Sequence, residues 1–153
     1  SANTEIKLPA GFSIYGVINY QYGEEELDDG TKAPLRHVAP MYGMGKLAYG
    51  KKKFKTEAYV LFNGNIDYEN LAPSEREKTH IYAKDKNGNP YSPSFYTLNL
   101  RMSYEINKYI NLFAGIENIT DVRYRPYSSG IAAPGRNFIV SLQARFWWYY
   151  III

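Results

Sequence analysis

The residues whose types best suit chemistry lie near the end of the chain, where arginine alternates with tyrosine: Arg123, Tyr124, Arg125 and Tyr127. A guanidinium group pairs with a carboxylate or phosphate through parallel hydrogen bonds, and an interleaved aromatic ring can stack on a chelate or a sugar. The segment therefore predicts a binding surface for an anionic solute. The alternative is an exposed loop with a stacked Arg–Tyr pair and no ligand, because loops carry binding sites only on average.

Arg36 and His37 form a second candidate binding pair, within a polar stretch that spans residues 23–40. A loop histidine can ligate haem iron or reach a metal chelate. The other histidine, His80, is distant in the sequence. The acidic run at 24–29 offers oxygen ligands of the kind that Ca²⁺ takes, but a solvated loop surface explains it more simply. We therefore predict no metal site.

Four further residues are predicted to form a structural motif at the rim of the last hairpin: Asn118, Asp121, Gly135 and Arg136. Asn and Asp side chains bond their own backbone and permit tight geometry, so turn formation explains them without a ligand. The functional alternative is a network that orders the loop, or an arginine contact with a lipid phosphate or an anionic solute.

Composition excludes several classes of protein. The 153 residues contain no cysteine, which rules out disulfides and thiolate metal sites, and the net charge of +3 is too small to argue for a nucleic-acid partner. No acid, base and nucleophile are placed together, so neither an enzyme nor a cofactor is predicted. The 16 tyrosines are a large excess, and tyrosine favours lipid–water boundaries as well as sugar- or protein-binding surfaces.

The elements that must position these loops alternate in side-chain character. From Phe95 to Ile106 the even positions are apolar and the odd positions are mostly polar or charged, and residues 137–146 repeat this period of two. Successive side chains of a β-strand point to opposite faces, so each predicted strand has one apolar and one polar face. Strands of about ten residues with this pattern suit a wall between lipid and a water-filled lumen. They suit a soluble sandwich less well, because its strands are shorter.

Six strands are clear and a seventh is partial. The clear strands cover residues 12–22, 41–50, 54–66, 95–106, 110–118 and 137–146, and the partial one covers residues 4–8. Short turns alternate with long polar loops at 23–40, 67–94 and 119–135, which is typical of an up-and-down outer-membrane barrel. Within the second loop, the residues from Asp85 to Asn89 predict a small hairpin. No run of about 18 apolar residues is present, so no transmembrane helix is predicted.

The sequence from Gly115 onward is similar to a known family. The run GIENITD at 115–121 is followed by YR at 124–125, SG at 129–130, APGRNF at 133–138 and an aromatic at Phe146. This order and spacing resembles the closing hairpin of TonB-dependent outer-membrane receptors, and residues 34–40 and 93–100 also look like that family.

The resemblance implies an all-β fold, in which residues 1–146 are the C-terminal part of an antiparallel up-and-down transmembrane β-barrel of about 22 strands. It implies a place in the bacterial outer membrane and a role in importing a scarce solute such as an iron chelate, haem or cobalamin. The implied partners are outer-membrane lipid, the remaining barrel strands and a plug domain in this or another chain, and TonB acting indirectly through the plug.

Two features depart from the family pattern. The plug and most of the expected strands are not within these residues, so the sheet is expected to pair with them. In addition, WWYYIII at 147–153 continues past Phe146, which resembles the family's C-terminal aromatic insertion signal. We predict an apolar tail outside the barrel segment at these positions.

Two alternatives fit the same strand pattern. One is a small closed outer-membrane barrel of about eight strands that acts as an adhesin or a binder. The other is a soluble, tyrosine-rich β-module that binds sugar or protein. A chain that is soluble without detergent would exclude both membrane interpretations.

Overall fold

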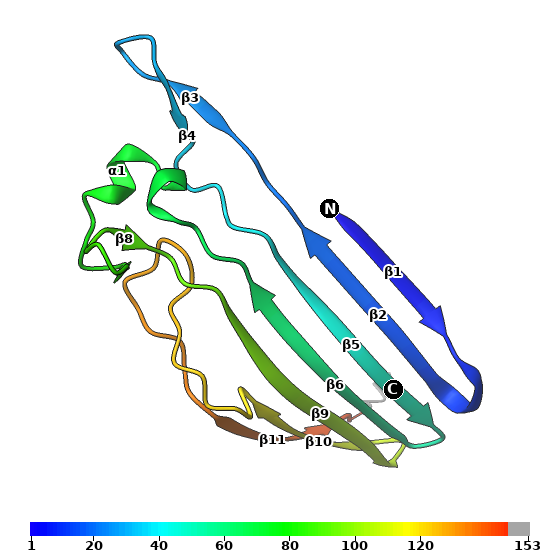
Figure 1. The fold of residues 1–153 in the computed structure, drawn as a ribbon. Helices are drawn as coiled ribbons and strands as arrows, with labels where there is room; N and C mark the ends of the chain where they lie inside the picture. The colour runs from blue at the N-terminus through cyan, green and yellow to red at the C-terminus, as the bar shows by residue number, and fades with distance from the viewer. Residues whose placement is uncertain (147–153) are drawn as a thin grey trace, which may run out of the picture.

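A computed structural model describes residues 1–146, and its main feature is one antiparallel sheet of seven strands (Figure 1). The strand order is β1-β2-β5-β6-β9-β10-β11, so each strand pairs with the next long strand along the chain. The strands are β1 (Ala2–Lys7), β2 (Phe12–Asn19), β5 (Tyr42–Lys51), β6 (Phe54–Asn63), β9 (Phe95–Asn107), β10 (Ile110–Glu117) and β11 (Asn137–Ala144). The predicted up-and-down order is confirmed. The strand that the sequence indicates only in part, β1, pairs with β2 over its whole length.

Short turns join the strands at one end of the sheet. The first contains the 3-10 turn η1 (Pro9–Gly11), and the second is a tight turn in which Lys52 has a φ of 54°. In the third, the Asn107 side chain accepts hydrogen bonds from the backbone N–H groups of Tyr109 and Ile110, at 2.9 and 3.0 Å. Asparagine is favoured in turns because its side chain bonds the backbone in this way.

The two faces of the sheet differ as the alternation predicts. Cross-strand partners share a face. The strand registers place one apolar row across all seven strands, formed by Ile6, Ile14, Leu47, Ala58, Leu100, Ile116 and Phe138. This face is exposed, with 42% of Leu98 and 77% of Val140 accessible. Within residues 1–146, it is therefore not the interior of a sandwich.

Aromatic side chains bracket the apolar face at both ends of the strands. The line at the turn end consists of Phe12, Tyr49, Phe54 and Tyr104. The line at the loop end consists of Tyr20, Phe62 and Tyr96. In β6 and β9 the two aromatics are eight residues apart, Phe54 and Phe62 in the one, Tyr96 and Tyr104 in the other, and Tyr20, the residue that follows β2, is eight residues from Phe12. At about 3.3 Å per residue, that spacing is about 26 Å along the strand.

The opposite face carries charged pairs and the most buried groups of the sheet. Lys46 Nζ lies 3.3 Å from the carboxylate of Glu57, and Arg101 Nη2 lies 2.7 Å from that of Glu117. The Arg101 guanidinium also lies over the ring of Tyr59, 5.1 Å from its centre. These pairs join neighbouring strands, as expected for charges on one face of a sheet.

The long connections contain short elements that the alternation pattern misses. The first holds the hairpin of β3 (Glu24–Glu26) and β4 (Lys32–Pro34), which projects beyond the sheet in Figure 1. The second holds the 3-10 turn η2 (Tyr68–Asn70), helix α1 (Pro73–Arg76) and the hairpin of β7 (Ala83–Lys84) and β8 (Pro90–Tyr91). Elements of two to four residues are too short to show a period.

The β7–β8 hairpin confirms the turn predicted between Asp85 and Asn89. Its carboxylate at Asp85 accepts hydrogen bonds from the backbone N–H groups of Asn87 and Asn89, both at 2.8 Å. Among residues 1–146, no helix has the length and apolar character needed to cross a membrane.

The sheet has two free edges in the part of the chain that the structure describes. There, β1 pairs only with β2 and β11 only with β10, so the seven strands form a curved wall and not a closed barrel. The alternative of a small closed barrel therefore finds no support in residues 1–146. Unpaired N–H and C=O groups at a sheet edge favour pairing with a further strand.

Candidate functional site

The long loops gather at one end of the sheet (Figure 1): the first loop spans 20–41, the second loop 64–94 and the third loop 118–136. The second and third loops share a small apolar core. Ile66, Leu71 and Tyr82 of the second loop are buried, and Tyr127 of the third packs against them. Burial raises the pKa of both tyrosines, so both phenols are neutral hydrogen-bond donors at physiological pH.

Glu75, in α1, is the polar centre of this cluster. Its side chain is 0% exposed and accepts hydrogen bonds from Lys78 Nζ at 2.6 Å, from the Tyr82 hydroxyl at 2.6 Å and from Ser128 Oγ at 3.1 Å. Arg36 Nε of the first loop donates to it at 3.2 Å. One buried carboxylate therefore links all three loops.

The surroundings of Glu75 decide its charge. Burial alone would raise the pKa of this carboxyl, but the hydrogen bonds from Lys78, Tyr82 and Ser128 and the charge of Lys78 outweigh it and lower the pKa from 4.5 to about 2. A folded-state pKa below the unfolded value means that the ionised group stabilises the loops above about pH 4.5. This contribution is lost as the pH falls toward 2.

Asn118 organises the third loop from its first residue. Its backbone is left-handed, with a φ of 49°, and its side chain is buried. Nδ2 donates to the carbonyls of Val122 and Pro134 at 2.9 and 3.2 Å, and Oδ1 accepts from the Val122 N–H at 2.9 Å. Its own N–H donates to Asn99 Oδ1 at 2.9 Å. The amide is therefore fully engaged inside the protein.

Asp121, Gly135 and Arg136 fix the other end of this loop. Asp121 Oδ1 accepts a hydrogen bond from the Arg136 N–H at 2.8 Å. A Cβ atom at Gly135 would lie 2.5 Å from the same oxygen, so a larger residue there would displace the Asp121 carboxylate from this hydrogen bond. Arg136 Nε donates to the carbonyl of Ile119 at 2.8 Å. The four rim residues thus lie together, and both hydrogen bonds of Arg136 stay within the third loop.

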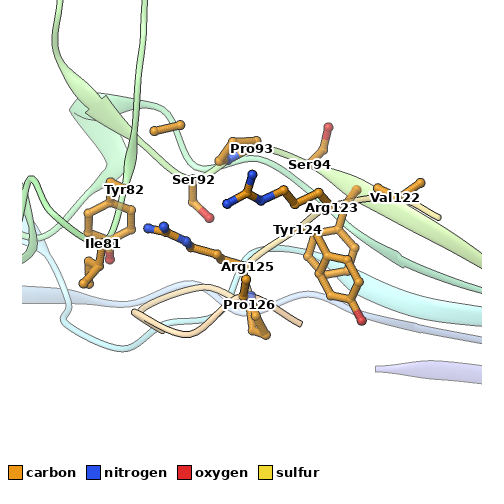
Figure 2. A pocket seen from close by; sticks show the side chains of 13 residues that line it. Ile81, Tyr82, Ser92, Pro93, Ser94, Val122, Arg123, Tyr124, Arg125 and Pro126 are labelled. Atoms are coloured by element: carbon orange, nitrogen blue, oxygen red, sulfur yellow. The ribbon is translucent and has the colours of Figure 1, made fainter. Parts of the chain in front are cut away.

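A pocket of about 370 Å³ lies between the second and third loops, next to the start of β9 (Figure 2). Three of the predicted binding residues line it: Arg123, Tyr124 and Arg125. The ring of Tyr124 stacks on Phe95, with the ring centres 4.0 Å apart and the planes at 25°. The other lining residues are Ile81, Tyr82, Ala83, Ser92, Pro93, Ser94, Val122, Pro126 and Ala132.

Both arginines direct their guanidinium groups into this pocket (Figure 2). Arg125 Nη1 donates to the carbonyl of His80 at 3.3 Å. Within residues 1–146, the Arg123 guanidinium makes neither a hydrogen bond nor an ion pair. No lining residue is acidic. The pocket can therefore offer several unpaired N–H donors to a ligand.

The remaining candidate binding residues lie outside the pocket. Arg36 is held by Glu75, and His37, whose Nδ1 lies 3.5 Å from Ser128 Oγ, has a left-handed backbone with a φ of 62°. Tyr127 belongs to the apolar core. Sequence patterns miss Glu75 because two of its partners, Arg36 and Ser128, are 39 and 53 positions away.

Phe146 is 83% exposed and is the last residue that the structure describes, so the predicted tail at 147–153 lies outside the described residues. Within residues 1–146, no group of three or more His, Cys, Asp or Glu side chains is placed to hold a metal ion.

Solved structures with a similar fold are transporters and receptors, not enzymes. The copper transporter OprC matches with a TM-score of 0.72 at 15% identity, covering 93% of this chain and 22% of that chain. A mutant of the ferric enterobactin receptor PfeA from Pseudomonas aeruginosa gives 0.67 at 17%, covering 94% and 21%. The siderophore receptor PiuA from Acinetobacter baumannii gives 0.56 at 16%, covering 92% and 20%.

No protein-family model matches the sequence, and no curated protein matches it significantly. At identities of 15–17%, the likeness to these structures establishes the fold. The chain spans only about a fifth of the length of each of them. It has the fold of the β-barrel wall of TonB-dependent receptors.

Proposed function

We propose that this chain is part of a TonB-dependent transporter in the bacterial outer membrane. Its apolar face contacts lipid, its polar face lines the lumen, and its loops present recognition groups to the solute. The two aromatic lines carry this proposal. Their separation of about 26 Å along the strands becomes about 20 Å across a wall whose strands tilt by about 40°. Outer-membrane barrels have an apolar band about 25 Å tall between two such aromatic girdles.

The two faces and the two edges of the sheet indicate which partners this chain would contact. The charged pairs of Lys46 with Glu57 and of Arg101 with Glu117 suit contact with water or with a polar plug domain. The free edges of β1 and β11 suit pairing with further strands of the barrel, because each unpaired backbone group in lipid costs several kcal/mol. TonB would act indirectly, through the plug. We assign residues 1–146 to the C-terminal part of the barrel, with Phe146 as the aromatic signal for insertion.

The solute is proposed to be a scarce metal or metal complex. The similar structures are a copper transporter, a ferric enterobactin receptor and a siderophore receptor. Haem and cobalamin belong to the same proposal, since an anionic, partly aromatic solute suits arginines interleaved with tyrosines.

Uptake measurements test this function. Cells that lack the protein containing this chain are compared with wild-type cells for import of radiolabelled copper, ferric siderophores, haem and cobalamin. We expect import of one of these solutes to be lost, and import in wild-type cells to stop when the energy coupling of the inner membrane is abolished. Fractionation serves as the second readout: recovery of the protein in the soluble fraction without detergent would rule out the membrane role.

A further inference from the structure

We propose that the pocket between the second and third loops binds a compact anionic group, a carboxylate or a phosphate, carried on a flat aromatic body. The inference deepens the proposed transport role and rests on it only for the side from which the ligand arrives. The charge, the walls and the position of the pocket support such a site.

The charge of the pocket favours an anion. Arg123 and Arg125 both point into it (Figure 2), and no lining residue is acidic. Other loop arginines are engaged elsewhere, Arg36 by a carboxylate and Arg136 by a backbone carbonyl. Arg123 has no such partner within residues 1–146. Guanidinium donors without a partner are best satisfied by a charge-assisted pair of hydrogen bonds to carboxylate or phosphate.

The walls of the pocket favour a flat apolar body next to that anion. The stacked rings of Phe95 and Tyr124 form one wall, and Ile81, Pro93 and Pro126 add apolar surface. Aromatic rings prefer offset stacking on other rings, and guanidinium planes stack on rings as well. The volume of about 370 Å³ is at the small end of the range for ligand pockets, so the bound part of the ligand is compact.

The position of the pocket links it to the polar face of the sheet. Tyr124 also lines a second cavity of about 330 Å³, together with Asn99, Arg101 and Glu117 of that face. Tyr124 therefore lines both cavities, so a ligand that stacks on it in the first cavity would lie next to the second.

Phenyl phosphate and benzoate are suitable probes, titrated into the detergent-extracted protein and followed by calorimetry or ligand-observed NMR. For ligands of this size, we expect a dissociation constant of roughly 0.1–1 mM. Arg123→Gln should weaken binding about tenfold or more, and Arg123→Lys should weaken it less, because lysine keeps the charge and loses the planar fork. Lys86→Gln removes the same charge from the exposed β7–β8 turn and should leave binding unchanged.

Arg125→Gln provides an independent second variant. It also removes the bond to the His80 carbonyl, so near-ultraviolet circular dichroism must first show that the loops keep their fold. The proposal is overturned if Arg123→Gln binds phenyl phosphate as tightly as the wild type. It is equally overturned if uncharged phenol binds as tightly as phenyl phosphate, or if Lys86→Gln weakens binding as much as Arg123→Gln.

A competition experiment separates the two sources of such an anion. Displacement of phenyl phosphate by vesicles that contain lipid A would identify a membrane phosphate as the anion and overturn the aromatic body, whereas lack of displacement would exclude that source and support a soluble ligand. Loss of probe binding in the wild-type protein, when that protein still imports its solute, would contradict only the proposed anion pocket. Probe binding to a protein that imports none of the tested solutes would contradict only the proposed transport role.

Discussion

Glu75 has no exposed surface and still carries a negative charge. That combination is stable only because Lys78, Tyr82, Ser128 and Arg36 all donate to it. A buried carboxylate that lost these donors would be strongly destabilising, whereas one with all of them fixes the geometry of its neighbours. At the scale of single residues, the loops therefore depend on this carboxylate and on the buried amide of Asn118.

Acid should loosen the loops through Glu75. Since folding lowers its pKa from 4.5 to about 2, the ionised group adds about 3 kcal/mol at neutral pH, and this is lost between pH 4.5 and pH 2. Glu75→Gln should lose a similar amount already at pH 7 and show little further loss in acid. Hydrogen exchange of the second loop, corrected for intrinsic rates, measures both effects. Glu77→Gln, at an exposed neighbouring position, is the control; equal acid sensitivity of Glu75→Gln and wild type would refute the assignment.

Removing the Asn118 side chain should release the third loop. Asn118→Ala deletes three hydrogen bonds and leaves an alanine in the left-handed region. We expect a cost of about 2–3 kcal/mol in the order of this loop. Faster trypsin cleavage after Arg123 reports it. Asn111→Ala, which removes only one long bond at 3.4 Å to Gln143, should leave the cleavage rate unchanged.

At the scale of secondary-structure elements, the sequence predicts the long strands and misses the short hairpin and the short helix. Long strands such as β6 and β9 keep a period of two over ten or more residues, so both their existence and their faces can be inferred. The β3–β4 hairpin and α1 have three or four residues per element, too few for any period. The contacts of Glu75 escape sequence analysis for another reason, since they join loops that only the fold brings together. Arg123 to Arg125 could be proposed from residue type alone, but not the stacking of Tyr124 on Phe95.

Val140 and Ser141 provide a matched test of the two faces. They are neighbours in the middle of β11, both are exposed, and their side chains point to opposite sides of the sheet. Val140→Arg should cost about 2–4 kcal/mol, because a charge near the middle of the apolar band faces lipid. Ser141→Arg should cost little, since its side chain faces the lumen. Heat-modifiable gel mobility of the two variants in outer-membrane fractions compares their folding, and equal mobility would contradict the facing of β11.

At the scale of the whole described chain, residues 1–146, the seven strands are a wall with two open edges. Six antiparallel pairings hold the wall together, and each joins strands that are consecutive once the short elements are set aside. Such a wall has backbone groups along the outer sides of β1 and β11 that need partners in lipid. Its stability is therefore tied to whatever strands complete the barrel.

Hydrogen exchange along the two edge strands tests this dependence. In the assembled protein, the outward-directed amides of β1 and β11 should be protected as strongly as those of the central strand β6, because further strands pair with them. The residues from Leu27 to Thr31, at the tip of the β3–β4 hairpin, serve as the exchanging reference in the same sample. Edge amides that exchange as fast as this tip would show that β1 and β11 stay unpaired.

The tip of the β3–β4 hairpin lies apart from the contacts that join the three loops (Figure 1). Among residues 1–146, the hydrogen bonds of this tip come from its own residues, with Asp29 accepting from the Thr31 hydroxyl at 2.6 Å, and a Cβ atom at Gly30 would meet nothing within 4 Å. A foreign peptide spliced in beside Gly30 would thus disturb neither Glu75 nor the arginine pocket. If the loops face the exterior of the cell, as proposed, this hairpin is a place to display an epitope tag. Antibodies could then count copies of the protein on living cells while its solute still passes.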